Sequence, residues 1–414
     1  MRILRRPGTA GLIFVIAVFE LLAFALIAVR PNPLDWVALG IGGCMVCLFL
    51  ITYLLLTTCF PHIDRYVIII VNFLVALGMI MQYRLTPETG MKQIVWFCGG
   101  QVGMFAVILI LQHIKKWQRY LWPMILCSVG LLSITLVLGV VRGGARNWIA
   151  IASFTFQPSE FAKVLLIMIL AIYLDKTSSI KKLLPLGLFV ACAVVLLVVA
   201  KDLGAALLFF LTSVTLYFVA TSNFWLTGLM LLAGAGGSIA AYKLFSHVRV
   251  RVQIWQNPWL LVEASGYQIV QGLMAIASGG LFGLGLYQGS PKHIPAYHTD
   301  FIFAVLCEEF GIIAGVIVII LFMVLVLRGA SIALNASNKT DALMALGCCT
   351  MLAYQTFIII GGVIKLIPLT GITLPFISYG GSSMLTNMII IGVLESIAIK
   401  NGKANEAQRD VIVT

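Results

Sequence analysis

Charged residues are scarce in this sequence of 414 residues: only 10% are Asp, Glu, Lys or Arg, while 61% are hydrophobic. Soluble domains carry about 25% charged residues and less than about half apolar ones. The scarcity of charge excludes a soluble enzyme, a disordered chain and a coiled coil. It leaves a chain that crosses a membrane many times, since one spanning helix needs about 20 apolar residues.

Cysteines with metal-binding spacing are absent, and acidic residues are few. The nine cysteines lie mostly inside apolar runs, and Cys44-x-x-Cys47 has no second pair. They predict packing residues rather than a zinc site or disulfides. The 15 Asp and Glu against 27 Lys and Arg give a net charge of +12. In a membrane protein this excess is typical of cytoplasmic loops, so we expect no nucleic-acid partner.

Twelve apolar stretches are long enough to span a membrane, which predicts an all-α polytopic integral membrane protein. They lie at residues 9–29, 36–58, 66–83, 93–112, 121–141, 159–174, 183–200, 203–220, 224–245, 301–327, 341–364 and 375–398. An even number of spans puts both termini on one side. The densest basic clusters, MRILRR, HIKKWQR and DKTSSIKK, fall inside when the termini are cytoplasmic. We therefore predict cytoplasmic termini.

The long connection between predicted spans is 246–300, which lies outside in this orientation. It is rich in Gly and aromatic residues and too apolar for a disordered loop. Long ordered loops in compact proteins are usually functional. We expect a long extracellular loop that carries the functional site.

Asp300 stands at the end of this loop, within HTDFIFAVLCEEFG. Beside His298, its carboxylate could act as a general base or bind a divalent cation. The alternative is structural, because Asp before an apolar run is also a favoured helix N-cap. Glu308 and Glu309, two turns later, are expected to form buried ion pairs.

Basic residues outside the predicted spans form a second set of candidates. Arg142 and Arg146 have no evident acidic partner, which suits an anionic group such as a pyrophosphate. Arg249 and Arg251 would point to one side of an extended segment and could serve the same purpose. For both pairs, anchoring to lipid headgroups is the alternative. Glu160 and Lys163 open a span and can pair on one helix face.

Two further features interrupt the apolar runs. Lys201-Asp202 predicts either a turn held by a local ion pair or a contribution to a polar cavity. The segment PLTGITLPFISYGGSS (368–383), which contains Ser378 and Ser382, predicts a broken helix at the edge of a cavity. The glycine-rich run 279–289 lacks the spacing of a nucleotide loop and follows no predicted strand.

Taken together, these segments resemble the SEDS family, the FtsW/RodA/SpoVE group. The resemblance covers about 66–399 and predicts two extra N-terminal helices (1–60), a SEDS-like transmembrane core (61–400) and a short cytoplasmic tail (401–414). The matching pieces, in order, are GARNWIAI…QPSEFAK (144–163), DLG (202–204), RVRVQIWQNPW (249–259), SGYQIVQGLMAIASGGLFGLGLYQGS (265–290), HTDFIFAVLCEEFG (298–311) and PLTGITLPFISYGGSS (368–383).

The resemblance implies a peptidoglycan glycosyltransferase in the cytoplasmic membrane of a bacterium. Such proteins polymerise lipid II at the outer face, beside a class B penicillin-binding protein, in division, elongation or sporulation. Asp300 matches the family's essential acidic residue, which would activate the acceptor hydroxyl, with Mg²⁺ or Mn²⁺ as a possible cofactor at Asp300. The positions that match the family's central cavity are Arg146, Glu160, Lys163 and Asp202. We add Arg142, Arg249, Arg251, His298, Ser378 and Ser382 as substrate-binding candidates.

The sequence departs from the family pattern at several positions near these motifs. Lys201 stands where the family usually has Pro, and Lys365 replaces a small residue; the others are Leu284, Ala296 and Ile359. The departures keep two alternatives open. One is a transporter that flips a lipid-linked cell-wall precursor, which needs no general base at one membrane edge. The other is a non-enzymatic scaffold for a penicillin-binding protein.

Overall fold

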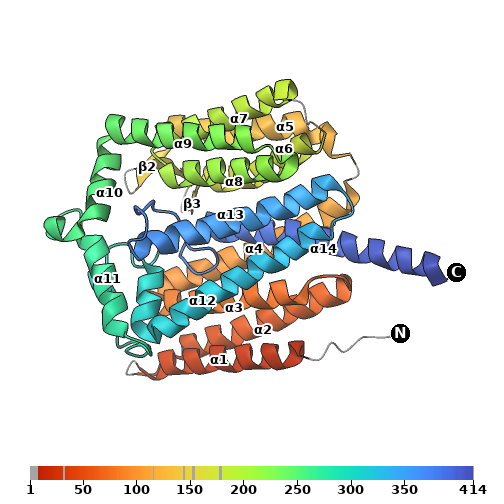
Figure 1. Ribbon diagram of the computed structural model, residues 1–414. Helices are drawn as coiled ribbons and strands as arrows, with labels where there is room; N and C mark the ends of the chain where they lie inside the picture. Colours follow the sequence, from red (N-terminus) through yellow and green to blue (C-terminus); the bar gives the residue numbers. More distant parts are fainter. Residues whose placement is uncertain are drawn as a thin grey trace.

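The computed structural model describes residues 8–30, 33–114, 116–142, 145–151, 154–176 and 180–413. Twelve long helices run side by side through these residues, as the sequence predicts (Figure 1). They are α1 (Thr9–Val29), α2 (Trp36–Cys59), α3 (Arg65–Leu85), α4 (Pro87–His113), α5 (Leu121–Leu138), α6 (Pro158–Lys176), α7 (Ile180–Val199), α8 (Leu203–Thr221), α9 (Phe224–Leu244), α12 (Ile302–Leu334), α13 (Lys339–Val363) and α14 (Gly381–Val413).

Ten of the twelve helices are long and apolar enough to cross a membrane. The exceptions are α7, whose apolar part is the shorter Leu183–Val199, and α6, which carries charged residues at both ends. The predicted polytopic helical class is therefore confirmed. α1 begins at the end of the bundle where α14 finishes (Figure 1). α14 also continues through most of the predicted tail, as far as Val413.

Helices α3, α13 and α14 form the centre of the bundle, because most of their residues are buried, whereas α9 buries none. The N-terminal pair α1 and α2 packs against α3 at one edge (Figure 1). Tyr83 Oη on α3 donates to Asp35 Oδ2, the residue that caps α2, at 3.0 Å. Glu20 and Glu395 are buried inside the bundle, as expected for intramembrane carboxyl groups.

A small antiparallel sheet, which the apolar pattern of the sequence does not predict, interrupts the helices between α5 and α6. Its strands are β1 (Val140–Arg142), β2 (Ala145–Ile151) and β3 (Phe154–Phe156), paired in the order β1-β2-β3. Burial alternates along β2, where Asn147 and Ile149 are buried and Arg146 and Ala150 are exposed, so one face of the strand packs on the bundle. Arg146 N donates to Ala200 O at 2.9 Å, which ties the sheet to the end of α7.

The long segment 246–300 is mostly helical rather than an open loop. It contains α10 (Ser246–Gln256), η2 (Pro258–Leu261), α11 (Tyr267–Gly279) and η3 (Pro291–His293). α10 and α11 lie across one end of the bundle, which is the end where β2 lies (Figure 1). The segment therefore covers the end of the bundle at which Asp300 lies, two residues before α12 begins.

The glycine-rich run fills a break in α12. Gly311 interrupts the helix with a φ of 87°, and Gly283 also has a positive φ of 82°. Backbone bonds close the break: Leu284 N donates to Glu308 O at 2.9 Å, and Ile312 N donates to Gly280 O at 2.9 Å. A Cβ on Gly283 would lie 2.2 Å from Glu309 O, so only glycine fits there. These glycines therefore have a packing role.

Candidate functional site

The side chains of Asp300 and Arg251 both lie next to Gly371, which is in the broken segment between α13 and α14. A Cβ built on Gly371 would lie 3.5 Å from Asp300 Oδ2 and 3.9 Å from Arg251 Nη2. Arg251 Nη1 donates to Thr370 O at 2.9 Å, which fixes the guanidinium beside this glycine. Three segments that are distant in sequence thus bring a carboxylate and a guanidinium to one point, and glycine leaves space between them.

Asp300 is a half-buried residue, and its carboxylate does not cap a helix. α12 begins at Ile302 with Phe301 as its N-cap residue, and no side chain caps it. The alternative interpretation of Asp300 as a helix N-cap is therefore wrong. Burial raises the pKa of Asp300 from 3.8 to about 6, and the Thr299 hydroxyl and the Arg251 charge oppose this rise.

His298 and Ser378 hold the chain on either side of this point. Ser378 Oγ accepts from Leu374 N at 2.8 Å and donates to Thr299 O at 2.7 Å. The carbonyl of His298 accepts from Tyr379 N at 2.9 Å. The His298 ring stacks on Tyr297, with 3.7 Å between ring centroids, and burial lowers its pKa. The broken segment is thereby bound to the residues that immediately precede Asp300.

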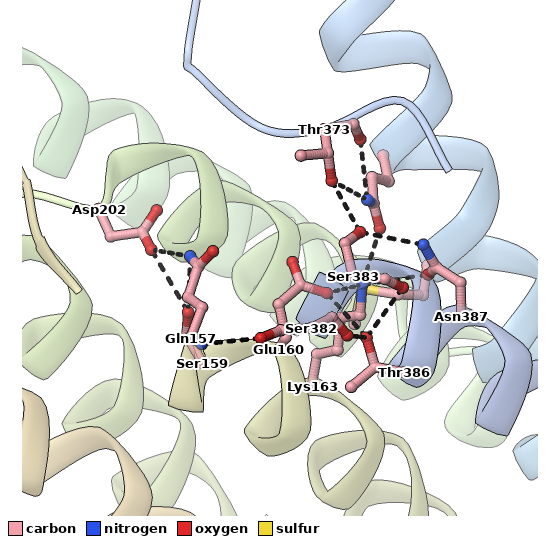
Figure 2. Close-up of polar contacts among 12 residues, drawn as sticks. Gln157, Ser159, Glu160, Lys163, Asp202, Thr373, Ser382, Ser383, Thr386 and Asn387 are labelled. Atoms are coloured by element: carbon pink, nitrogen blue, oxygen red, sulfur yellow. Dashed lines mark hydrogen bonds and ion pairs between the residues drawn. The ribbon is translucent and has the colours of Figure 1, made fainter. Parts of the chain in front are cut away.

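A second cluster surrounds Asp202, the residue that caps α8 (Figure 2). Asp202 Oδ2 accepts from Asn147 Nδ2 at 2.7 Å, from Gln157 Nε2 at 3.0 Å and from Ser159 Oγ at 3.4 Å. Its Oδ1 accepts from Ala205 N at 3.1 Å. Burial raises the pKa of Asp202, while the bonds from Asn147 and Ala205 oppose the rise. Its expected ion pair with Lys201 is not formed within the described residues.

Lys163 lies deeper in α6 and is 3% exposed. Its Nζ pairs with Glu160 Oε2 at 2.6 Å, as the spacing predicts, and donates to Gln355 Oε1 at 2.9 Å and Asn387 Oδ1 at 3.2 Å. Thr386 Oγ1 donates to the same Glu160 oxygen at 2.9 Å (Figure 2). The ammonium is therefore fully surrounded by partners from α6, α13 and α14.

Thr373 connects the residues around Lys163 to the site at Gly371 where Asp300 and Arg251 lie. Gln355 Nε2 donates to Thr373 O at 2.9 Å, and Thr373 Oγ1 donates to Ser383 Oγ at 2.7 Å. Ser382 Oγ accepts from Gln157 N at 3.0 Å, which joins α14 to the start of α6. Since Thr373 is two residues from Gly371, one continuous polar network reaches from Asp202 and Lys163 to the broken segment.

The remaining predicted arginines do not all reach this network. Arg249 lies on α10, and residues two apart on a helix point to nearly opposite sides, so the expected common direction of Arg249 and Arg251 is wrong. Arg249 is exposed. Arg146 is also exposed, and its Nη1 donates to Leu136 O at 3.3 Å, near the end of α5. The side chain of Arg142 lies outside the described residues.

The two glutamates of α12 hold the segment that precedes Asp300. Glu309 pairs with Arg84, whose guanidinium lies over the Tyr287 ring at 4.9 Å, as the prediction of a buried ion pair requires. Glu308 does not form an ion pair in the described part of the chain. Its Oε1 accepts from Ser290 N at 2.9 Å instead. Both contacts fix residues 287–290 against α12.

Several members of the network are neutral residues that the sequence analysis overlooked. Gln82 Nε2 donates to His298 O at 2.9 Å, and Gln93 Nε2 donates to Ser378 O at 3.2 Å. Gln355 and Asn387 are the partners of Lys163. All four are amides inside predicted apolar spans. Buried amides at membrane depth need hydrogen-bond partners, so their positions in the sequence could have predicted a polar network.

Comparison with known proteins identifies the family. The family model described as cell cycle protein, that of FtsW, RodA and SpoVE, matches residues 55–403. The chain belongs to the FtsW/RodA/SpoVE family.

Relatives within the FtsW/RodA/SpoVE family match most of the chain. Peptidoglycan glycosyltransferase RodA of Mycobacterium tuberculosis is 33% identical over 90% of this chain and 87% of its own length. Stage V sporulation protein E of Bacillus subtilis is 36% identical over 81% of this chain and 96% of its own length. A solved chain of a peptidoglycan synthase complex is 27% identical and covers 82% of this chain and 98% of its own length, with a TM-score of 0.70. The solved RodA of Thermus thermophilus is 26% identical, covers 81% of this chain and 96% of its own length, and has a TM-score of 0.61.

Three of the departures from the family pattern share an unusual backbone conformation. Lys201, Lys365 and Ala296 have φ angles of 62°, 61° and 56°, in the left-handed region. Proline cannot adopt a positive φ. A family member with Pro at the position of Lys201 must therefore have a different backbone conformation there. Leu284 is exposed in the glycine-rich run, and Ile359 is fully buried in α13.

The residues around Asp300 do not fit a cation site that the protein itself would form. Mg²⁺ and Mn²⁺ prefer several oxygen ligands, and here one carboxylate lies near the guanidinium of Arg251. Nor do the described residues contain a group of three or more His, Cys, Asp or Glu side chains that could hold a metal ion.

Proposed function

We propose that this chain is a peptidoglycan glycosyltransferase that polymerises lipid II, with Asp300 as the catalytic base. One observation supports the role of Asp300: the carboxylate of this half-buried residue caps no helix and lies with Arg251 around Gly371. Family membership and the activity in the names of relatives such as RodA of Mycobacterium tuberculosis support the reaction class. A pKa of about 6 suits a base that works near neutral pH.

In the proposed reaction, the hydroxyl oxygen of the acceptor sugar attacks the anomeric carbon of the donor. A carbon–oxygen bond forms to the acceptor, and the bond from the anomeric carbon to the pyrophosphate breaks. The hydroxyl proton passes to Asp300, and the lipid pyrophosphate leaves with the bonding electron pair. Arg251 donates through Nη1 to Thr370 O and makes no other hydrogen bond with the described residues, so it retains N–H groups for the charge that develops on the leaving group.

The buried network has a positioning role in this proposal. Asp202 and Lys163 have their bonding capacity filled by neighbouring side chains, so neither is free to bind substrate without losing contacts. The network instead fixes the broken segment through Thr373 and Ser382. Catalytic geometry requires such support, because small displacements of reacting groups cause large losses of rate.

The orientation that this function needs is cytoplasmic termini in the cytoplasmic membrane, with Asp300 at the outer face. A Ser290→Cys variant tests it, because Ser290 lies at the Asp300 end of the bundle. A membrane-impermeant thiol reagent added to intact cells should label this position, and an Asn335→Cys variant at the other end should react only after lysis. Background labelling is measured on the unsubstituted chain. Labelling in the reverse pattern would overturn both the orientation and the assignment of the site.

A class B penicillin-binding protein is the proposed partner. A solved chain similar to this one comes from a complex in which a peptidoglycan synthase coordinates polymerization and crosslinking. The decisive experiment is a polymerisation assay with labelled lipid II on purified protein, with and without such a partner. We expect glycan chains to form in a manner that depends on Asp300. Transport of labelled lipid II across vesicles without polymer formation would favour the flippase, and neither activity would favour the scaffold.

A further inference from the structure

A cavity of about 340 Å³ lies at the end of the bundle opposite Asp300. It is bordered by the start of α3, the second half of α12 and the later turns of α14. Its volume is at the lower end of the range for small-molecule sites. None of the predicted site residues lines it, and the proposed reaction does not use it.

Most charged groups of this cavity are paired with one another. Arg328 donates to Asp64 Oδ2 through Nε at 3.0 Å and through Nη2 at 2.5 Å, and its guanidinium lies over the Tyr66 ring at 5.2 Å. Asp64 Oδ1 accepts from the backbone at the start of α3. His62 Nε2 lies 3.1 Å from Glu406 Oε2. The negative charge of Asp64 is therefore already compensated.

Arg65 is the cation of the cavity that is left without a partner. Its side chain is half-buried, and it forms no ion pair or hydrogen bond with any residue that the structure describes. A partly desolvated guanidinium is most stable beside an anion. The amides of Asn335, Asn401 and Asn405 line the same cavity. Asn335 Nδ2 donates to Ser331 O and Asn401 Nδ2 to Ile332 O, and the second N–H of each amide remains a suitable donor to an anion.

We propose that this cavity binds a phosphate group, with Arg65 as its main contact. Two sources share this chemistry: the headgroup of an anionic phospholipid and a water-soluble phosphate compound. Basic pockets between transmembrane helices on the cytoplasmic side are a known arrangement for binding phospholipid headgroups. The cavity faces the cytoplasm if the proposed orientation of the chain holds, and phosphate binding itself requires no glycosyltransferase activity.

The test compares Arg65→Ala with two matched variants of the full-length protein. Arg65→Lys keeps the charge, and Arg119→Ala removes an exposed arginine at the same end but outside the cavity. Inorganic phosphate is titrated against detergent-purified protein at constant ionic strength. Separately, unfolding midpoints are compared in nanodiscs of phosphatidylcholine with and without phosphatidylglycerol. Neither measurement uses lipid II, so failure of the polymerisation assay does not affect the outcome.

The proposal expects wild-type protein and Arg119→Ala to respond alike to at least one probe. Arg65→Ala should bind about ten- to a hundredfold more weakly, since a charged hydrogen bond is lost, and Arg65→Lys should recover part of the binding. A response to nanodiscs alone identifies the headgroup as the source, and a response to inorganic phosphate identifies a soluble compound. The proposal is overturned if wild-type protein responds to neither probe, or if Arg65→Ala and Arg119→Ala respond equally.

Discussion

Asp300 and Asp202 lie at the same end of the bundle, and burial raises the pKa of both carboxyl groups, yet their surroundings are opposite. Asp202 accepts hydrogen bonds from three side chains and from the backbone of α8. Asp300 is half-buried, caps no helix and lies beside Gly371. A carboxylate whose acceptor sites are filled holds structure in place, whereas one that lies beside a glycine and caps no helix keeps acceptor capacity for a substrate.

The largest expected effect comes from Asp300→Asn, which should abolish polymerisation of lipid II. The amide keeps the size of the side chain but cannot accept the acceptor's proton, and general base catalysis contributes roughly 10²–10⁴-fold in rate. Because Asp300 caps no helix, thermal stability should be unchanged. The measurement is lipid II consumption by purified variant and wild type. Near-wild-type activity in the variant would remove Asp300 from the reaction and erase the difference from Asp202.

Next in size is Arg251→Ala, compared with Arg249→Ala on the same helix. Arg251 lies beside Gly371 and retains N–H groups for a phosphate, so its loss should lower kcat/KM about ten- to a hundredfold. Arg249 is exposed and should have a much smaller effect. Steady-state kinetics of the two variants at one salt concentration provide the measurement. Equal losses would mean that the charge of α10 as a whole matters, and the close position of Arg251 would lose its significance.

The spans and Asp300 could be predicted from the sequence because both leave local signals. Apolar length marks a membrane helix, and an ionisable residue at the start of a span is conspicuous. The direction of Arg251 could not be predicted, since Arg249-Val250-Arg251 fits an extended segment as well as α10. The partners of Asp202 were also inaccessible: Asn147 and Gln157 are brought to it by the sheet and by the start of α6, and that contact is set by tertiary packing.

Asp202→Asn should affect stability more than chemistry. The amide can still cap α8, but Asn147 and Gln157 would lose a charged acceptor, at a cost of about 1–3 kcal/mol in the free energy of unfolding. The measurement is the midpoint of thermal unfolding in detergent. Ser159→Ala is the comparison variant: it removes the longest bond to Asp202, 3.4 Å, and the bond from Gln157 Nε2 to Ser159 Oγ, 3.0 Å, but keeps the charged acceptor, and should cost less. A stable Asp202→Asn protein that had lost all activity would place Asp202 with Asp300 among the reacting groups.

The smallest expected effect is a shift in pH dependence, and it separates the two carboxyl groups most directly. A base acts only when it is deprotonated, so with a pKa of about 6 for Asp300 the rate should fall about tenfold per pH unit below that value. The positive charge of Arg251 lowers this pKa, so Arg251→Ala should move the acid limb of the pH–rate profile to higher pH. Arg251→Lys keeps the charge and should restore the position of the acid limb.

Asp202→Asn should leave the position of the acid limb unchanged, because the pKa of Asp202 does not control the reaction in this proposal. The measurement is kcat/KM for lipid II across the pH range in which each variant remains folded. If Arg251→Ala lowered kcat/KM at high pH but left the acid limb of the profile in place, Arg251 would act on the substrate alone. If Asp202→Asn moved the acid limb, the titrating base would have been assigned to the wrong carboxylate.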